Sequence, residues 1–413
     1  MSPEEAERYL LSLELFGMRF GLDRMRRLMT ALGHPERAFD SIHVVGTNGK
    51  SSTVRMIAAI LAHHDLRTGA YLSPHLASFT ERIRVADADL EPVAFASAVS
   101  RAARAAELVN RSLGPEDRVT QFEALTAAAY WELARRQVEV AVIEAGLGGR
   151  YDATNVIPSR VQVLTSIGLE HTRWLGPTIS DIAREKLDVV QPQSTLVLGA
   201  GLHPDAGAQA ERVAAQRGAQ IVWAGRDPGV AVGARGAFQR RNFALACAAA
   251  EAYRGRLDPE AVRAAAREVR VPGRLQQIDD HPLTMLDGAH NPDGIAALAE
   301  SAAECRQGRE PLVAVVSILE DKDAAAMLAG LIGICDALIF TSSQNLRALP
   351  PPTLQSLTRQ LDGPPAEVVP APRAAVARAR ELAGPGGMVL VTGSIYLVAD
   401  LLAQPGARRA SML

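Results

Sequence analysis

Short apolar runs alternate with Ala-rich amphipathic segments along most of this chain. The runs are rich in β-favouring residues, and several of the segments between them repeat apolar residues at helical spacing. This alternation is typical of βαβ units, in which helices cover both faces of a mostly parallel sheet. In the first part of the chain it predicts strands at 42–45, 68–72, 139–144, 161–166, 195–199 and 220–223. Residues 3–32 precede them and predict two helices, separated by the segment from Gly17 to Gly21.

The alternation is interrupted once and then starts again. Helices are predicted at 238–254 and 258–268, and the Pro272-Gly273 pair after them indicates a hinge. Strands are then predicted at 283–286, 312–317, 337–341, 366–369 and 388–392, with helices at 293–304, 323–332, 353–361, 373–383 and 395–403. With 413 residues the chain exceeds the size of a single core. We therefore expect two α/β domains, 1–270 and 271–413.

Composition and charge narrow the classes of function. The chain is 48% hydrophobic and carries a formal net charge of −2, with Lys and Arg spread along it. This argues against a nucleic-acid partner or a polybasic membrane surface. The three cysteines lie far apart in apolar runs, and we expect buried thiols in a reducing compartment. The acidic start of the chain and the lack of an 18-residue apolar run lead us to expect a cytoplasmic protein.

The strongest local signal is the segment from Ile42 to Thr53, IHVVGTNGKSST. An apolar strand runs into a Gly-rich turn, and Lys50 and three hydroxyl residues open a helix predicted over 54–61. Backbone N–H groups and a helix N-terminus in this order bind polyphosphate, and the Lys reaches the terminal phosphates. The Gly lies four residues before the Lys, and Val44 stands at the sixth. That shorter loop favours an ATP-dependent amide ligase over a kinase or GTPase, and the alternative is a turn whose glycines only permit its geometry.

Polar residues follow three further predicted strands. Ser73 lies in a Ser-Pro turn, and on its own that turn needs no function. Glu144 ends an apolar strand, where a carboxylate is suited to magnesium, which prefers a few hard oxygen ligands beside nucleotide phosphates. His171 follows a third strand end, where we favour a ligand role over a structural one. Lys186 lies on a helix starting near Pro177-Thr178, and the sequence alone does not reject a solvated lysine there.

The second predicted domain opens with the cluster from Asp287 to Pro292, DGAHNP. A carboxylate, an imidazole and an amide follow one strand, and with Arg274 on the hinge they can close over a nucleotide held by the first domain. The alternative is that Asp287 and His290 only cap the helix that follows.

Together these motifs resemble the folylpolyglutamate synthase and dihydrofolate synthase family of the Mur ligase superfamily. The resemblance covers nearly the whole chain and implies a P-loop, Mur-ligase-like parallel-sheet ATPase domain followed by a smaller Rossmann-like α/β domain. The segments that carry it are Phe20 to Arg24, Ile42 to Thr53, Ser73 to Leu76, Thr80 to Ile83, Thr120 to Glu123, Gly146 to Asn155, Glu170 to Lys186, Pro272 to Arg274, Asp287 to Pro292, Asp321 to Asp323, Arg347-Ala348 and Thr392 to Ser394.

The resemblance also implies a role for each group of residues. Lys50, His171 and Lys186 would be catalytic, and Lys186 would carry a carbamate formed with carbon dioxide, which needs a lysine of lowered pKa. The implied ATP-binding residues are Thr47, Asn48, Gly49, Lys50, Ser51, Ser52, Asn242, Arg274, Asp287 and His290. The implied magnesium ligands, for two ions, are Ser73, Glu144, His171 and carbamylated Lys186. The implied pterin and folate contacts are Phe20, Gly21, Gln121, Phe122, Arg150 and Asp152.

The sequence departs from the family pattern at several positions. Ser51 replaces the usual Gly of the phosphate loop, Glu170 stands where Asp is usual, and Leu187-Asp188 follow Lys186 where Ala-Gly is common. Phe238 replaces a frequent His. The changes at 170 and 187–188 adjoin the implied second metal site and put its geometry in question.

The implied reaction is ATP-driven amide formation through an acyl phosphate, with L-glutamate as the amine. Folates, and dihydropteroate in addition, would supply the carboxylate, and we expect a monomer that works on small molecules. The alternatives are a Mur-type ligase for a different acid, a P-loop phosphotransferase, and a non-catalytic nucleotide- or folate-binding descendant. The sequence retains Lys50, Glu144, His171 and Lys186, which argues against the last of these.

Overall fold

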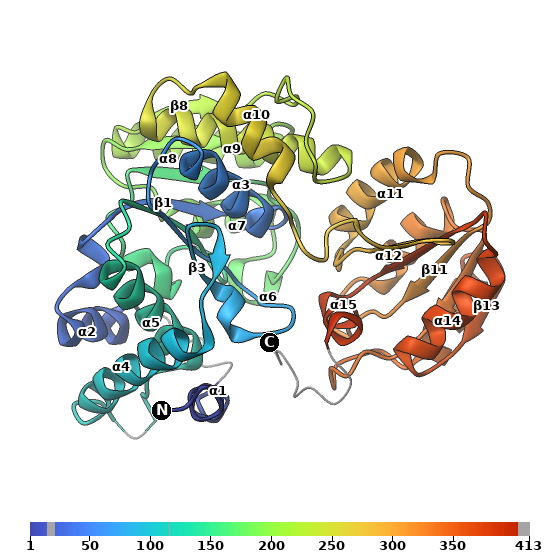
Figure 1. The fold of residues 1–413 in the computed structure, drawn as a ribbon, viewed down its shortest axis with the longest axis horizontal. Coiled ribbons are helices and arrows are strands. Elements are labelled where there is room, and N and C mark those ends of the chain that lie inside the picture. Colours follow the sequence, from blue (N-terminus) through green and yellow to red (C-terminus); the bar gives the residue numbers. More distant parts are fainter. Residues whose placement is uncertain (15–20, 115, 404–413) are drawn as a thin grey trace.

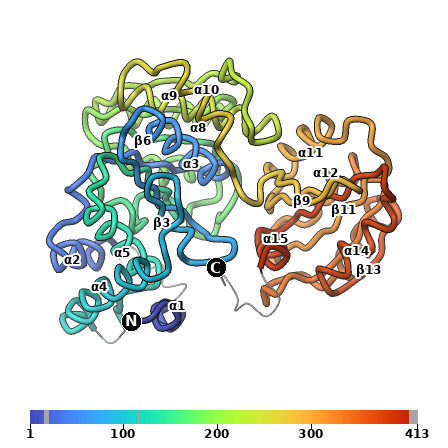
Figure 2. The backbone as a smooth tube through the Cα atoms, viewed as in Figure 1, coloured from blue at the N-terminus to red at the C-terminus, as the bar shows by residue number. Residues whose placement is uncertain are grey.

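The computed structural model describes residues 1–14, 21–114 and 116–403. They form two α/β units that lie side by side, each built around its own sheet (Figure 1). The first unit takes up the chain as far as α10, and the second begins with β9. Figure 2 shows the backbone passing from one unit to the other in the stretch between these two elements. The boundary at 270/271 remains a prediction.

The first sheet has the strand order β4-β3-β2-β5-β1-β6-β7-β8. All neighbours from β2 to β8 pair in parallel, and β3 and β4 continue the sheet as an antiparallel edge. The strands are β1 (Asp40–Val45), β2 (Thr68–Tyr71), β3 (Ile83–Val85), β4 (Ala88–Asp89), β5 (Val140–Glu144), β6 (Val161–Leu164), β7 (Thr195–Leu198) and β8 (Gln220–Trp223). The helices are α1 (Pro3–Ser12), α2 (Asp23–Leu32), α3 (Lys50–Ala62), α4 (Pro92–Asn110), α5 (Gln121–Arg135), α6 (Thr172–Leu175), α7 (Ile179–Leu187), α8 (Pro204–Arg217), α9 (Ala237–Arg254) and α10 (Pro259–Glu268).

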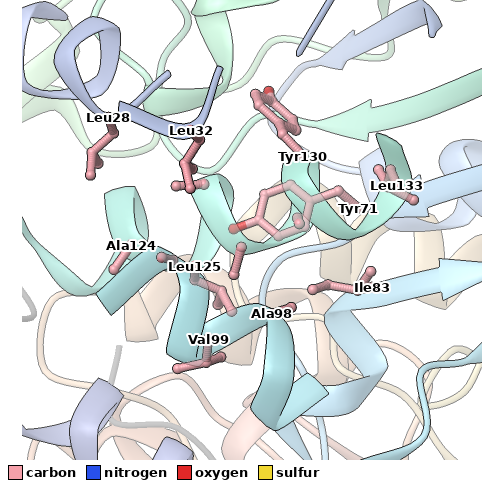
Figure 3. Packing of buried hydrophobic residues seen from close by; sticks show 14 of the residues in the cluster. Leu28, Leu32, Tyr71, Ile83, Ala98, Val99, Ala124, Leu125, Tyr130 and Leu133 are labelled. Carbon is pink, nitrogen blue, oxygen red and sulfur yellow. The ribbon is translucent and has the colours of Figure 1, made fainter. Parts of the chain in front are cut away.

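Apolar cores cover both faces of this sheet, which explains why a central strand such as β5 is an apolar run as far as Glu144. Along β5, Ala141 and Ile143 join a core with α1, α2, α4 and α5, whereas Val140 and Val142 join a core with α3, α9 and α10. Figure 3 shows the first of these cores, where Tyr71 and Tyr130 lie among aliphatic side chains. The rigid double-sided packing fixes the carboxyl ends of the strands, from which the candidate site residues project.

The second sheet has the order β13-β12-β11-β14-β10-β9, parallel except for the β9–β10 pair. Its strands are β9 (Gln276–Asp280), β10 (Leu283–Leu286), β11 (Leu312–Val316), β12 (Ala337–Phe340), β13 (Ala366–Val368) and β14 (Met388–Thr392). Its helices are α11 (Pro292–Arg306), α12 (Ala324–Ile332), α13 (Pro351–Gln360), α14 (Pro372–Ala383) and α15 (Ile395–Leu402). Apolar cores cover both faces here as well.

Every strand expected from the apolar runs is present, and the expected α/β fold class is confirmed. The three strands that the pattern missed are the antiparallel ones, β3, β4 and β9. Both residues of β4 are exposed, and β9 contains no fully buried residue, so neither carries the apolar signal of a central strand. Within the described ranges, no helix is long and apolar enough to cross a membrane.

Candidate active site

The phosphate loop joins β1 to α3 at the carboxyl edge of the first sheet. The helix begins at Lys50, four residues earlier than expected, after Gly49 in the left-handed region at φ 86°. A Cβ at Gly49 would lie only 2.7 Å from Oδ1 of Asn242, so this glycine lets α9 bring an amide against the loop. The structure thus places Asn242 beside the loop, and its contact with ATP remains a prediction.

The loop is braced by the residues that follow β6. Ser166 Oγ accepts a hydrogen bond from Asn48 N at 3.0 Å, and Thr165 Oγ1 donates to the carbonyl oxygen of Asn48 at 2.7 Å. Thr47 Oγ1 in turn accepts from the backbone N–H of Gly168 at 3.0 Å. The sequence reasoning assigned no role to Thr165 or Ser166, although both lie at the end of the strand predicted over 161–166, shortly before His171.

Two lysines converge on one backbone carbonyl of the loop. Lys50 Nζ lies 3.0 Å and Lys186 Nζ 2.9 Å from the carbonyl oxygen of Gly46. Lys186 is buried on α7, so the alternative of a solvated lysine is wrong. Burial, followed by the charge of Lys50, lowers the pKa of Lys186 to about 7. A substantial fraction of this amine is therefore neutral near pH 7 and is able to react as a nucleophile.

Glu144 lies at the end of β5 and is only 1% exposed. Its Oε1 accepts from Ser51 Oγ at 2.8 Å, and its Oε2 accepts from the backbone N–H of Ser73 at 3.0 Å. Burial raises the pKa of Glu144, and Lys50 and these two hydrogen bonds oppose the rise. A buried carboxylate beside a serine hydroxyl is the kind of oxygen donor set that magnesium takes together with phosphate oxygens and water. The residues present therefore fit the expected ion.

No group of three or more His, Cys, Asp or Glu side chains that could hold a metal by themselves occurs in the part of the chain that the structure describes. His171 precedes α6 and is exposed overall. Desolvation of the ring and the charges of Lys322, Lys186 and Lys50, opposed by Glu170, lower its pKa to about 4. Its ring thus lies among the cations of the site, and its role as a metal ligand remains a prediction.

The loop that carries Ser73 is held by two charged residues. Glu81 accepts hydrogen bonds from the backbone N–H groups of Leu76, Ala77 and Ser78. Arg82, 1% exposed, donates through Nε to Nδ1 of His75 at 2.9 Å. These contacts fix the turn that points the Ser73 N–H at Glu144. The sequence reasoning included both residues only as parts of a motif, because their partners are backbone groups and a ring that only the folded loop brings near.

The described residues expected to line a folate site lie before α2, at the start of α5 and in the loop after β5. Phe122, at the start of α5, packs its ring over Gly146, where a Cβ would lie 2.6 Å from the ring. Gln121 is buried and donates to the carbonyl oxygen of Leu10 at 2.8 Å. Gly21 is among the described residues, whereas Phe20 lies outside them. Their contact with a folate remains a prediction.

Asp152 and Arg150 occupy the loop after β5. Asp152 is buried, and its two carboxylate oxygens accept from the Leu147 and Thr154 N–H groups at 2.8 and 3.0 Å. Arg150 is exposed and lies 3.4 Å from both Glu185 and Asp188. One of the departures from the family pattern, Asp188, thus pairs with an expected folate contact rather than with the lysine before it.

The second unit brings its own cluster to the site. Asp287, 2% exposed, accepts from the Leu275 and Ala289 N–H groups at 2.9 and 2.8 Å, and burial raises its pKa against the charge of Arg274. The side chain of Asn291 accepts from Gly294 N at 2.8 Å. The alternative that Asp287 or His290 caps α11 is therefore wrong, since Asn291 is the cap.

Glu170, the second departure, connects the two units. Its carboxylate lies 2.9 Å from Lys322 Nζ and 3.5 Å from His290 Nε2. Burial alone would raise its pKa, but the hydrogen bond and charge of His290 and the charge of Lys322 bring it well below its usual range. Glu170 is consequently an anion held by residues of the second unit.

Comparison with known proteins gives matches along the whole chain. Residues 273–395 match the family model described as Mur ligase, glutamate ligase domain. The chain is 31% identical over 415 residues to the dihydrofolate synthase/folylpolyglutamate synthase of Bacillus subtilis, covering 94% of this chain and 95% of that protein. It is 33% identical to a probable bifunctional folylpolyglutamate synthase/dihydropteroate synthase of Haloferax volcanii, covering 97% of this chain but 50% of that protein. The chain thus spans half the length of this relative.

Solved structures match with similar coverage. The Mycobacterium tuberculosis folylpolyglutamate synthase complexed with ADP has a TM-score of 0.89 and 31% identity, over 97% of both chains. Escherichia coli FolC in complex with DHPP and ADP has a TM-score of 0.85 and 28% identity, over 97% of both chains. The Yersinia pestis bifunctional folylpolyglutamate synthase/dihydrofolate synthase complexed with AMPPNP and Mn ion has a TM-score of 0.85 and 29% identity, over 97% of both chains.

Proposed function

Because this chain belongs to the folylpolyglutamate synthase and dihydrofolate synthase family of Mur ligases, and is thus an ATP-dependent ligase, we propose that it joins L-glutamate to folates. The observation that carries the proposal is the convergence of Lys50 and buried Lys186 on the Gly46 carbonyl. A phosphotransferase needs only the lysine of its phosphate loop. A second, buried lysine of lowered pKa has no part in that chemistry, but it fits the carbamate expected in this superfamily.

ATP would bind with its phosphates over the loop. The N-terminus of α3 and the backbone N–H groups of residues 49–52 would face the phosphate oxygens, and Lys50 would leave the Gly46 carbonyl to contact the terminal phosphate. Asn242, Arg274, Asp287 and His290 would hold the nucleoside from the opposite side. These assignments are supported by the approach of Asn242 to Gly49 and by the relatives solved with ADP.

A divalent ion bound at Glu144, with hydroxyls of Ser51 and Ser73 nearby, would neutralise charge on the phosphates during transfer. Neutral Lys186 would add to carbon dioxide through Nζ, forming a carbamate and releasing one proton. This would place an anion beside Lys50, whereas the ammonium form of Lys186 would repel that cation. The raised pKa of Glu144 is consistent with a carboxylate that binds a cation, and the lowered pKa of Lys186 is consistent with an amine that is converted to an anion.

The reaction would then proceed in two balanced steps. A carboxylate oxygen of the acceptor attacks the γ-phosphorus of ATP, the bond to the β,γ-bridging oxygen breaks, and ADP and an acyl phosphate result. The neutral amine of L-glutamate attacks the acyl carbon, the bond to the phosphate oxygen breaks, and the amide and inorganic phosphate result with release of one proton. The protein contributes positioning and charge, because phosphoryl transfer needs no protein nucleophile.

Two carboxylates are proposed as acceptors. The first is the glutamate γ-carboxylate of a folate. The second is the benzoate of dihydropteroate, because the relative that matches 95% of its own length bears both activities in its name. Phe122, Gly21, Gln121, Arg150 and Asp152 would line the acceptor site. We further propose a cytoplasmic enzyme that works as a monomer on these small molecules.

The test is glutamate-dependent release of ADP by the purified protein. Magnesium-ATP and L-glutamate are supplied with either a reduced monoglutamyl folate or dihydropteroate, and the product masses are measured. A mass gain of one glutamyl residue with either acceptor supports the ligase. A phosphorylated acceptor that accumulates without any glutamate requirement would instead indicate a phosphotransferase, and Lys50→Met is the inactive control.

A further inference from the structure

The two units of the molecule meet through a polar cluster centred on Glu170. This side chain is 10% exposed, as is Lys322, and their ion pair at 2.9 Å joins residues 152 positions apart in the sequence. The second oxygen of Glu170 accepts from Asn291 Nδ2 at 3.2 Å, and His290 lies 3.5 Å from the first. All three partners belong to the second unit, so the described contacts of the Glu170 carboxylate all reach across the interface.

A second contact joins Asn291, at the N-terminus of α11, to the phosphate loop. Asn48 donates through Nδ2 to Asn291 Oδ1 at 3.1 Å, and Asn291 donates through Nδ2 to Asn48 Oδ1 at 3.0 Å. Asn291 is 4% exposed and also caps α11. Asn291 therefore fixes the N-terminus of α11 against both Glu170 and the loop expected to bind phosphate.

The backbone before Glu170 is shaped for this approach. A Cβ added at Gly168 would overlap Oδ2 of Asp293, in the first turn of α11. Only a residue without a side chain allows α11 to come this close without a shift of the Asp293 carboxylate. The Glu170 carboxylate, the Asn48–Asn291 amide pair and Gly168 thus all allow or hold the N-terminus of α11 close to the first unit.

We propose that Glu170 is a positioning residue that latches the second unit onto the phosphate loop, acting through Lys322 and Asn291 rather than as a metal ligand. The latch aligns His290 and Lys322 with the site in which Lys50 and Lys186 lie. This inference rests on the proposed function, since it concerns the nucleotide site of that enzyme. The departure from Asp fits this role, because the longer Glu side chain reaches Lys322, Asn291 and His290 of the opposite unit at once.

The same interface offers a matched comparison. Arg240 and Arg241 on α9 pair with Glu304 and Glu300 on α11, with shortest separations of 2.6 and 2.8 Å. These side chains are 33–53% exposed, and exposed ion pairs contribute little to stability. Glu304→Gln therefore breaks an ion pair between the units away from the phosphate loop and is the control for Glu170→Gln.

The experiment is a double-mutant cycle on nucleotide binding. Magnesium-ADP affinity is measured by calorimetry for the wild type, Glu170→Gln, Lys322→Met and the double variant. We expect each single variant to weaken ADP binding on the order of tenfold, because misplacement of a binding group by about 1 Å carries a cost of this size or more. The double variant should be no weaker than the worse single one, since both remove one latch. Glu304→Gln should change the affinity less than twofold.

Two further readouts separate a latch from a metal ligand. Small-angle scattering of the ligand-free proteins should show a larger radius of gyration for Glu170→Gln and Lys322→Met, and no change for Glu304→Gln. The Mg²⁺ concentration that half-saturates ADP binding should stay unchanged in Glu170→Gln. Effects of Glu170→Gln and Lys322→Met that multiply, a shifted Mg²⁺ requirement, or an unchanged radius of gyration would overturn the latch. None of these readouts needs turnover, so failure of the ligase assay leaves them interpretable.

Discussion

Replacing Ser51 by Ala tests how the phosphate loop and the carboxylate beside it depend on each other. The Ser51 hydroxyl donates to Glu144 Oε1 at 2.8 Å, and the only other hydrogen bond described for this carboxylate comes from the Ser73 N–H. The alanine variant removes one of these donors without adding volume. The carboxylate is 1% exposed, so water does not readily replace the hydroxyl.

The size of the loss follows from the charge on Glu144. A hydrogen bond to a charged group contributes about 1.5–3 kcal/mol and a neutral one about 1 kcal/mol. Burial raises the pKa of Glu144, and loss of the hydroxyl raises it further. The variant then binds more protons in its folded state than the wild type in the interval between the two pKa values, so it loses stability relative to the wild type as pH rises through that interval. The stability of the variant is furthest below that of the wild type at pH values above both pKa values. At pH values below both, the difference falls to about 1 kcal/mol.

Urea unfolding of the wild type, Ser51→Ala, Glu144→Gln and the double variant isolates the pair as a coupling free energy. All three tryptophans, Trp131, Trp174 and Trp223, lie in the first unit, so their fluorescence reports on that unit. Ser342→Ala, which removes only a 3.3 Å hydrogen bond to a carbonyl in the second unit, is the control. A coupling below about 0.5 kcal/mol at pH 8, or one that grows on acidification, would refute the reasoning.

Three other predictions address the same site. Gly149→Ala places a Cβ 2.5 Å from the Lys186 carbonyl oxygen, and overpacking against backbone should lower stability by about 1–3 kcal/mol in thermal unfolding, so an unchanged Tm contradicts it. Burial and the charge of Lys50 lower the pKa of Lys186 from 10.5 to about 7. In carbon-dioxide-free buffer, the unfolding free energy of the wild type should therefore rise with pH between 7 and 10.5 relative to that of Lys186→Met. A difference between the two proteins that does not change with pH would argue against the lowered pKa. Gly49→Ala forces a left-handed alanine, at about 1–2 kcal/mol, against Asn242, and calorimetry should show ADP affinity reduced about tenfold, whereas unchanged affinity would contradict the tight loop geometry.

The sequence predicted the central strands because they are buried on both faces and therefore read as continuous apolar runs, as in β5 and β11. It missed β3, β4 and β9, in which most residues are at least partly exposed and whose pairing is antiparallel at a sheet edge. The start of α3 was placed too late, since Lys50 to Thr53 are polar and the apolar periodicity begins only after them.

The phosphate loop could be recognised in the sequence because its residues are contiguous. Residues that only the fold brings together could not be recognised in this way. The burial of Lys186 depends on its contact with Gly46, 140 positions away, and the Glu170–Lys322 pair spans 152 positions. No local pattern distinguishes such a lysine from a solvated one on a helix. The binding roles of Phe20, Arg150 and the other acceptor-site residues stay predictions, to be tested with bound substrates.

The most direct test of the ligase account is the mass of the product formed from magnesium-ATP, L-glutamate and a reduced monoglutamyl folate. We predict a folate heavier by one glutamyl residue, with one ADP released per amide formed, and no product from Lys50→Met or when glutamate is omitted. A phosphorylated folate formed without glutamate, or ADP release that does not depend on any acceptor, would contradict it.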